Sequence, residues 1–445
     1  MKRCDTDVAV IGAGFAGVTV ARELAQRGHR VTVLEARDRL GGRTWMRPSP
    51  LGRELELGGT WVHWIQPFVW AEIARYGLKL VASPAPESVV ISGGGKAREE
   101  PADRLFELLD DALMEFLAGS RDLLPQPYDF HPLSDDLKRL DAVSVTDRIV
   151  ELNLDDDTAA LLRAFWALNF NGDPEDSAYT QALRWAALSA GDWKLLFEAC
   201  STYKLVKGTR ALVEAIAADA KGAEFHFDTT VSAVDDSGDI AVVTLSDGRT
   251  ITARRVVVTV PIGALNSISF TPPLARDLQA VADEGQASRG IKVWARIRGE
   301  VKPFGALAAD IDSAFTFLLY EYAIDGDSLV VAFGPESGRL DATNPRAVEA
   351  ELRKWRPEIE VVAVDSHDWT DDPLSRQTWP MLRPNQLNAV LSAAGGTDRA
   401  VRLLGSDYAR GWAGFIDGAI ESGLAGARQI INEFESSTAT TQGES

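Results

Sequence analysis

The feature that most constrains the fold lies in the first 35 residues, where two apolar runs flank a glycine-rich loop and a helical segment. Residues 7–11 form the first apolar run, the loop Gly12–Gly17 follows at once, and residues 18–27 have the composition of a helix. The second apolar run covers residues 30–34. This order, completed within about 30 residues, predicts a strand–helix–strand unit of a parallel sheet.

The glycines of this loop have distinct roles in a nucleotide-binding turn. Gly12 allows the tight turn after the strand, Gly14 lets backbone approach a pyrophosphate, and Gly17 lets the helix pack closely on the sheet. The helix N-terminus offers free N–H groups and a partial positive charge to phosphates. Glu35 ends the second strand, where a carboxylate binds ribose hydroxyls. The unit therefore predicts a nucleotide cofactor, and the acid disfavours the ribose phosphate of NADP.

The residues after Glu35 distinguish FAD from NAD. The segment 36–44 carries arginines and a second glycine pair, and Gly58-Gly59-Thr60-Trp61 allows another close backbone approach. A nicotinamide dehydrogenase has no need of these groups there. A long, extended FAD does, because its pyrophosphate and flavin end need more backbone and more positive charge around them. FAD is therefore predicted.

Composition excludes several other classes. Lys and Arg total 46 against 65 Asp and Glu, a net charge of −19, which repels nucleic acid. The same field favours solubility and attracts small cations, amines among them. Two cysteines and no Cys/His cluster predict neither a disulfide framework nor a metal site. No apolar run approaches the ~20 residues of a membrane span, and no signal peptide is evident, so we expect a cytoplasmic protein.

The pattern of elements predicts an α/β fold with two domains. Helices are expected over 105–117, 158–168, 209–220 and 414–434, and strands over 250–253 and 255–261 among others. A discontinuous Rossmann-like FAD-binding domain is predicted for residues 1–80, 204–284 and 386–434. A mixed-sheet α+β substrate domain is predicted for 81–203 and 285–385, followed by a disordered tail, 435–445. Whether the protein is a monomer or a homodimer stays open.

These segments resemble the flavin amine oxidase family, which includes monoamine and polyamine oxidases. The resemblance rests on Gly12–Gly17, Glu35, Arg37–Arg43 and Gly58-Gly59-Thr60, and on the C-terminal Gly405–Asp407 and Gly414–Ala419, and it runs from about residue 5 to 432. Within the family, shorter motifs are most similar to the bacterial 6-hydroxynicotine oxidase group. They are Asn169–Gly172, Gly290–Val293, Leu319–Tyr322, His367–Trp369 and Asp372–Leu374.

The resemblance implies FAD and the residues that contact it. The cofactor-binding residues it implies are Gly12, Ala13, Gly14, Phe15, Ala16, Gly17, Glu35, Ala36, Arg37, Gly42, Arg43, Gly58, Gly59, Thr60, Trp61, Val231, Trp369, Asp407, Phe415 and Ile416. Thr378 stands where enzymes with covalently attached flavin have cysteine. Threonine has no thiolate, so the FAD is expected to be non-covalent.

Five side chains are expected to act on the substrate. From the residues alone, Lys292 reads as a lysine whose charge reaches solvent at a strand end; the resemblance implies instead that it holds a water near flavin N5, and burial would lower its pKa. Trp379 and Phe415 would form an aromatic slot, with phenylalanine in place of the family's usual tyrosine. Asn169 and Tyr320 would orient a polar heteroaromatic substrate. Trp61 replaces a smaller aromatic of the 6-hydroxynicotine oxidase group.

The implied reaction is amine oxidation. Hydride would pass from the α-carbon of a neutral amine to flavin N5, O₂ would reoxidise the flavin to give H₂O₂, and the imine would be hydrolysed. A cyclic or secondary amine of the nicotine type is one candidate substrate.

Two alternatives use a similar scaffold. The first is a C–C desaturase of the phytoene desaturase or protoporphyrinogen oxidase type, which would want a longer apolar pocket and often a membrane-facing segment. The second is a non-catalytic protein like the GDP-dissociation inhibitors, against which the intact glycine loop, Glu35 and Lys292 argue.

Overall fold

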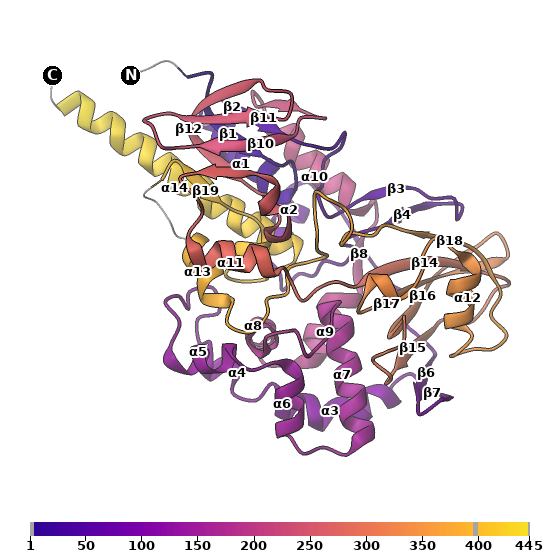
Figure 1. The fold of residues 1–445 in the computed structure, drawn as a ribbon. Helices are drawn as coiled ribbons and strands as arrows, with labels where there is room; N and C mark the ends of the chain where they lie inside the picture. Colours follow the sequence, from indigo (N-terminus) through magenta and orange to yellow (C-terminus); the bar gives the residue numbers. More distant parts are fainter. Residues whose placement is uncertain (1–3, 395–398, 444–445) are drawn as a thin grey trace.

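The computed structural model describes residues 4–394 and 399–443, with side chains described as far as residue 436. Two large sheets form its framework, and helices pack against both (Figure 1). The first sheet has eight strands in the order β13-β10-β11-β12-β1-β2-β9, with β19 beside β12. Its strands are β1 (Thr6–Ile11), β2 (Val31–Leu34), β9 (Glu224–His226), β10 (Val231–Asp235), β11 (Ala241–Leu245), β12 (Thr250–Val258), β13 (Ser269–Thr271) and β19 (Val401–Leu403).

Strand β1 lies at the centre of this sheet and is parallel to both neighbours, β2 and β12. Its residues Val8–Ile11 are buried, as expected of a parallel strand covered on both faces. Val8 and Val10 pack with apolar residues of α1 (Phe15–Gln26), α10 (Gly208–Asp219) and α14 (Ile416–Gly443). Helices α1 and α14 lie side by side (Figure 1). The strand–helix–strand unit predicted from the sequence is present.

Two predicted boundaries differ from the structure. The strands predicted over 250–253 and 255–261 are one strand, β12, which pairs with β11 in its first half and with β1 in its second. Helix α14 continues through Gly443, whereas a disordered tail was predicted from residue 435. Glu435 forms an ion pair with Arg27 at 3.6 Å, a contact beyond the predicted helix end. Residues 444–445 lie outside the described residues.

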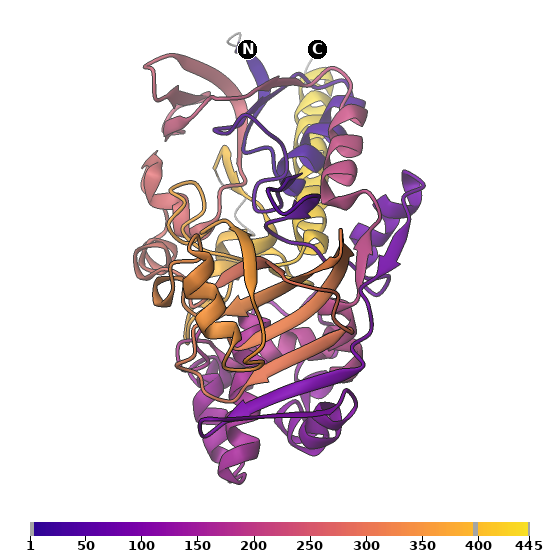
Figure 2. The same ribbon diagram turned by 90° about the vertical axis from the view of Figure 1, so that its right-hand side faces the viewer.

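The second sheet forms one wall of the cavity that is described in the next subsection. Its strand order is β18-β14-β17-β16-β15-β6-β7, and Figure 2 shows its strands across the lower half of the molecule. The strands are β6 (Ser88–Gly93), β7 (Lys96–Pro101), β14 (Ile291–Ile297), β15 (Phe304–Ala308), β16 (Phe317–Ile324), β17 (Asp327–Gly334) and β18 (Val361–Ser366).

The two faces of the second sheet pack against different helices. One face packs with α12 (Pro345–Leu352) around Val293, Leu318 and Val330. The other face, with Phe317, Val331 and Phe333, packs into the main core together with a block of helices. That block comprises α3 (Arg104–Phe116), α4 (Ser120–Leu123), α5 (Asp135–Asp141), α6 (Val145–Glu151), α7 (Asp156–Phe170), α8 (Tyr179–Leu188) and α9 (Trp193–Ser201).

The remaining elements connect these parts. They are α2 (Pro67–Arg75), α11 (Arg276–Glu284), α13 (Leu387–Ala394), the short helices η1 (Ile262–Ser267), η2 (Ser337–Arg339) and η3 (Ser406–Tyr408), and the strand pairs β3 (Met46–Pro48) with β4 (Glu54–Glu56) and β5 (Leu80–Ala82) with β8 (Tyr203–Leu205). The predicted domain boundaries stay a prediction. Within residues 4–394 and 399–443, no helix has the length and apolar character that crossing a membrane requires.

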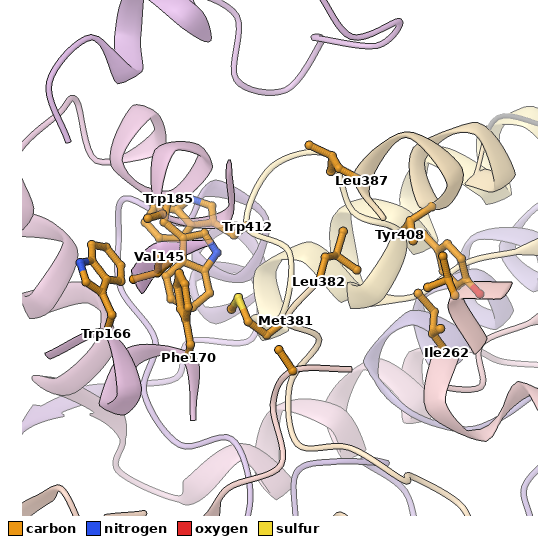
Figure 3. Packing of buried hydrophobic residues seen from close by; sticks show 14 of the residues in the cluster. Val145, Trp166, Phe170, Trp185, Ile262, Met381, Leu382, Leu387, Tyr408 and Trp412 are labelled. Carbon is orange, nitrogen blue, oxygen red and sulfur yellow. The ribbon is translucent and has the colours of Figure 1, made fainter. Parts of the chain in front are cut away.

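One continuous apolar core joins the helical block to the first sheet. Figure 3 shows this core passing from the tryptophans of the helical block, through the loop before α13, to the short helices beside the first sheet. The residues labelled there are Val145, Trp166, Phe170, Trp185, Trp412, Met381, Leu382, Leu387, Tyr408 and Ile262. Such close packing fixes the two parts relative to each other, and the cavity described next lies between them.

Candidate active site

A cavity lies between the carboxyl ends of the first parallel strands and the inner face of the second sheet. Gly12 and Glu35, which follow β1 and β2, line one part of it, and Phe317, Leu319 and Phe333 line another. Ligands of open α/β sheets bind beyond the carboxyl ends of the strands. The cavity therefore adjoins the expected nucleotide position and extends to the second sheet.

The glycine loop has the geometry of a phosphate cradle. The N-cap of α1 is Gly14, so no side chain accepts a hydrogen bond from the first N–H groups of the helix. The first turn of α1 carries no acidic residue. Gly14 faces Gly42: a Cβ on Gly14 would lie 3.9 Å from the Cα of Gly42. Gly12 has a φ of +103°, which a glycine adopts without strain. A helix N-terminus without an acidic cap, beside two facing glycines, fits a pyrophosphate.

Gly17 has a different role from its neighbours. It does not line the cavity, and a Cβ there would lie 2.0 Å from the carbonyl oxygen of Gly12. Its role is the close packing of α1 on the loop. Ala13 likewise does not line the cavity, and its backbone N–H donates to Glu35 Oε2 at 2.7 Å. The packing role of Gly17 agrees with the role expected from the sequence, and the assignment of both residues to the cofactor site stays a prediction.

Glu35 is buried and ties two loops together at the cavity wall. Besides the Ala13 N–H it accepts the backbone N–H of Arg37 at 2.9 Å. The guanidinium of Arg37 donates to Asp372 at 2.8 Å and to Ser375 at 3.2 Å. Although burial opposes it, hydrogen bonds from His367 and Arg37 hold the pKa of Asp372 well below its usual range. These contacts hold the expected ribose-binding carboxylate in place.

Arg43 links the N-terminal segment to the C-terminal one. Its guanidinium donates to the carbonyl oxygen of Thr378 and to Ser406 Oγ, both at 2.9 Å, and it pairs with Asp407. Asp407 also accepts from the backbone N–H of Ile262 and from Gln377, each at 2.9 Å. Arg43 lines the cavity and Asp407 does not. Asp407 therefore holds Arg43 in place at the cavity wall, and its own assignment to the cofactor site stays a prediction.

The remaining predicted cofactor residues line the cavity. They are Gly12, Gly14, Phe15, Ala16, Glu35, Ala36, Arg37, Gly42, Arg43, Gly58, Gly59, Thr60, Trp61, Val231, Trp369, Phe415 and Ile416. Thr378 lines it too, and its Oγ1 is buried without a hydrogen-bond partner. An unpartnered buried hydroxyl and a cradle free of side chains both fit a bound flavin nucleotide.

Lys292 extends from β14 into the cavity wall and is buried. Its Nζ donates to the carbonyl oxygens of Glu56 and Gly58, at 2.8 and 3.0 Å, and to Thr60 Oγ1 at 2.6 Å. Burial lowers the pKa of Lys292 to about 7, against the attraction of the Glu56 carboxylate. The reading of Lys292 as a lysine whose charge reaches solvent is wrong.

Trp379 and Phe415 both line the cavity, and each is held by its neighbours. The indole N–H of Trp379 donates to the carbonyl oxygen of Asn169 at 3.2 Å. The ring of Phe415 meets the rings of Trp185 and Trp412 edge-on, with centroids 5.0 and 5.1 Å away. Aromatic pairs prefer such edge contacts. Two oriented rings therefore share one cavity with the glycine cradle.

Two predicted substrate residues have different outcomes. Asn169 lines the cavity, and its Nδ2 donates to the carbonyl oxygen of Phe165 at 2.8 Å. Tyr320 does not line the cavity: it belongs to the core on the α12 face of the second sheet. Successive side chains of a strand point to opposite faces, so Leu319 faces the cavity and Tyr320 faces away. The prediction of Tyr320 as a substrate contact is wrong.

The sequence missed the apolar end of the cavity. Three of its residues, Phe197, Cys200 and Ser201, come from α9, and the others come from α7, α8 and the second sheet. Burial raises the pKa of the Cys200 thiol to about 12, so it acts as a small apolar group. The alternation of Phe317 and Leu319 on β16 could have indicated a cavity face. No comparable signal marks α9.

Comparison with known proteins decides the family. Residues 15–431 match the model of the flavin-containing amine oxidoreductase family. The chain belongs to this family. It is 34% identical over 434 residues to a pseudooxynicotine dehydrogenase of Pseudomonas sp., covering 96% of this chain and 86% of that one. It is 30% identical over 449 residues to the (S)-6-hydroxynicotine oxidase of Paenarthrobacter nicotinovorans, covering 96% and 99%.

Solved structures agree on the fold. Putrescine oxidase bound to putrescine superposes with a TM-score of 0.81 at 23% identity, covering 96% of this chain and 99% of that chain. Cyclohexylamine oxidase from Brevibacterium oxydans gives 0.80 at 21% identity, covering 97% and 100%. The flavin amine oxidase fold, the FAD cofactor and the activity on C–N bonds, all predicted from the sequence, are confirmed. The desaturase and the non-catalytic alternatives are not favoured.

Proposed function

We propose that this flavin amine oxidase oxidises a neutral secondary or cyclic amine of the nicotine type and passes the electrons to O₂. One observation carries the proposal: the glycine cradle, the aromatic pair Trp379/Phe415 and the buried Lys292 line the same cavity. Relatives named for nicotine-type substrates, at 34% and 30% identity, support the substrate class.

The glycine cradle and the residues beside it would bind the nucleotide part of the cofactor. Gly12, Gly14 and the first turn of α1 would bind the pyrophosphate, and Glu35 the ribose. Arg43, beside Ser406 and the Thr378 carbonyl, would add positive charge next to the pyrophosphate. When bound, FAD supplies the acceptor for a hydride from the amine's α-carbon.

The substrate end of the cavity selects the protonation state of the amine. Trp379 and Phe415, with Phe317 and Leu319, surround the amine with apolar groups. Moving an ammonium ion out of water into such surroundings is costly, so the neutral amine is favoured. Only the neutral nitrogen has a lone pair to support hydride loss from the adjacent carbon. The product is an iminium or imine, which water then hydrolyses.

Lys292 contributes a proton-bearing group at the side of the cavity. As an ammonium it donates all three of its protons, to the carbonyl oxygens of Glu56 and Gly58 and to Thr60 Oγ1. As a neutral amine it has a lone pair free to accept from a water. With a pKa of about 7 both forms are populated near neutral pH. We assign to it the positioning of a water beside the reacting carbon and nitrogen.

The experiment combines an absorbance and a peroxide readout. The purified protein is mixed anaerobically with a panel of nicotine-type and simple primary amines, and the loss of the yellow flavin absorbance is followed. A peroxidase-coupled assay then measures H₂O₂ in air. Bleaching by secondary amines, followed by stoichiometric H₂O₂, supports the proposal. Bleaching without H₂O₂ would show a dehydrogenase that uses another acceptor, and no bleaching by any nicotine-type amine would refute the substrate class.

A further inference from the structure

Trp61 forms a wall of the cavity next to Lys292. Its ring centroid lies 5.2 Å from the Nζ of Lys292 and 5.9 Å from the ring centroid of Phe333. All three residues line the cavity. The indole therefore limits the space available to a substrate on the side of Lys292.

A chain of polar groups holds the indole from behind. The indole N–H of Trp61 donates to Ser83 Oγ at 3.3 Å, and the Ser83 hydroxyl donates to Glu321 Oε1 at 3.0 Å. The other carboxylate oxygen of Glu321 pairs with the Nζ of Lys204, which also donates to the hydroxyl of Tyr322 at 2.9 Å. Each donor of this polar network has an acceptor, and none of the four residues behind Trp61 lines the cavity.

The backbone fixes the same group of residues. Trp61 and Lys204 form an antiparallel bridge, so Lys204 holds Trp61 through the main chain as well as through the polar chain. The backbone N–H of Ser83 donates to the carbonyl oxygen of Thr202 at 2.7 Å. The indole is thus anchored at its backbone and at its only polar atom, which leaves it little freedom to turn.

Both side chains of the ion pair between Glu321 and Lys204 are buried. Glu321 and Lys204 are each less than a tenth exposed. A buried ion pair often adds little to stability over well-packed apolar residues. Here its carboxylate orients the Ser83 hydroxyl, which in turn orients the indole. The pair therefore has a role in geometry beside any contribution to stability.

We propose that Trp61 is a specificity-determining residue that limits the bulk of the amine substituent, and that Ser83, Glu321 and Lys204 are positioning residues for it. The inference rests on the proposed function, since it concerns the substrate of the same cavity. Shortening the indole, or releasing it from its anchor, should admit larger substituents without removing the catalytic groups.

The test uses two substrates that differ by one fused ring, 2-phenylpyrrolidine and 2-(1-naphthyl)pyrrolidine. For holoenzyme of the wild type and of Trp61→Phe, Ser83→Ala and Glu321→Gln, kcat/KM is measured for both amines, and dissociation constants are measured from flavin difference spectra. Trp61→Phe should raise the naphthyl-to-phenyl ratio of kcat/KM about tenfold, as expected for a changed apolar pocket wall. Ser83→Ala and Glu321→Gln should raise it roughly threefold, with kcat for the phenyl compound little changed.

A matched control separates positioning from stability. Glu72 accepts two bonds from the fully buried Arg22, at 2.6 and 2.7 Å, in a pair outside the cavity lining. Glu72→Gln should lower the melting temperature and leave the substrate ratio unchanged. A ratio that stays at the wild-type value in Trp61→Phe and Ser83→Ala would overturn the inference, even if Glu321→Gln fails to accumulate.

The two proposals fail in distinguishable ways. If the wild type binds neither pyrrolidine and oxidises neither, the proposed substrate class fails. If it binds or oxidises them and the variants keep the wild-type ratio, only the role of Trp61 fails. The dissociation constants decide the role of Trp61 even where turnover is slow.

Discussion

The Nζ atom of Lys292 lies 2.6 Å from the Oγ1 atom of Thr60, one residue before the cavity wall at Trp61. This contact joins β14 of the second sheet to the loop that follows β4, and both residues line the cavity. Because Lys292 is buried and uncharged in part near neutral pH, it affects both stability and chemistry.

Lys292 should make stability depend on pH. Burial lowers its pKa from 10.5 to about 7, so between these pH values the unfolded chain carries a proton that the folded chain has released. The free energy of unfolding should therefore rise with pH across that window, by at most about 1.4 kcal/mol per pH unit from this group. Denaturant unfolding of the wild type and of Lys292→Met, at several pH values in the window, gives the difference in slope. Equal slopes would contradict the lowered pKa.

Lys292→Met should keep FAD but slow the reaction. The substitution removes a positioned proton-bearing group, and a loss in kcat or in the rate of reoxidation on the order of a hundredfold is expected. Stopped-flow absorbance separates flavin reduction from reoxidation. Lys302→Met, at a surface lysine paired with Glu87, is the control and should behave as wild type. Unchanged kinetics in Lys292→Met would remove Lys292 from the mechanism.

Gly14→Ala should weaken FAD binding, whereas Gly17→Ala should lower stability. A Cβ on Gly14 meets nothing closer than 3.9 Å and projects beside the cradle, so the variant should fold but bind FAD weakly. A Cβ on Gly17 would lie 2.0 Å from a backbone oxygen, so that variant should lose stability first. The ratio of flavin to protein absorbance and the melting temperature of the apoprotein distinguish the two. A Gly14→Ala variant with full flavin content would argue against the cradle.

Trp379→Phe should weaken substrate binding more than it slows turnover. It keeps an aromatic wall but removes the hydrogen bond to the Asn169 carbonyl, so the ring loses its fixed orientation. An increase in KM of about tenfold, with a smaller change in kcat, is expected. Trp70→Phe, at a surface tryptophan, serves as the control. An unchanged KM in Trp379→Phe would show that the hydrogen bond to the Asn169 carbonyl does not set the orientation of the ring for substrate binding.

The sequence predicted the cofactor end of the site because its signals are local. Gly12, Gly14 and Glu35 occur at fixed spacings within one strand–helix–strand unit, and the structure places all three on the cavity. The packing role of Gly17 is equally local, since it follows from the close approach of α1 to Gly12, whereas the motif alone does not show that Ala13 donates its N–H to Glu35.

The substrate end of the cavity is harder to predict from the sequence, because its residues come together only in the tertiary fold. Both faces of β16 are buried, so composition could not tell the cavity face of Leu319 from the core face of Tyr320. Helix α9 contributes Phe197 and Cys200 through its packing against the second sheet, which no spacing in the sequence records. The sequence predicts two strands in place of β12 because Arg254 interrupts the run between residues 250–253 and 255–261.

The pairing of Arg43 with Asp407 has a consequence for biosynthesis. These two side chains come from opposite ends of the chain, and Ile262 and Gln377 complete the arrangement. During translation the glycine loop leaves the ribosome long before its C-terminal partners exist. A nascent chain therefore presents only part of the flavin pocket, and tight capture of the cofactor must wait until synthesis has passed Asp407 and the first turn of α14.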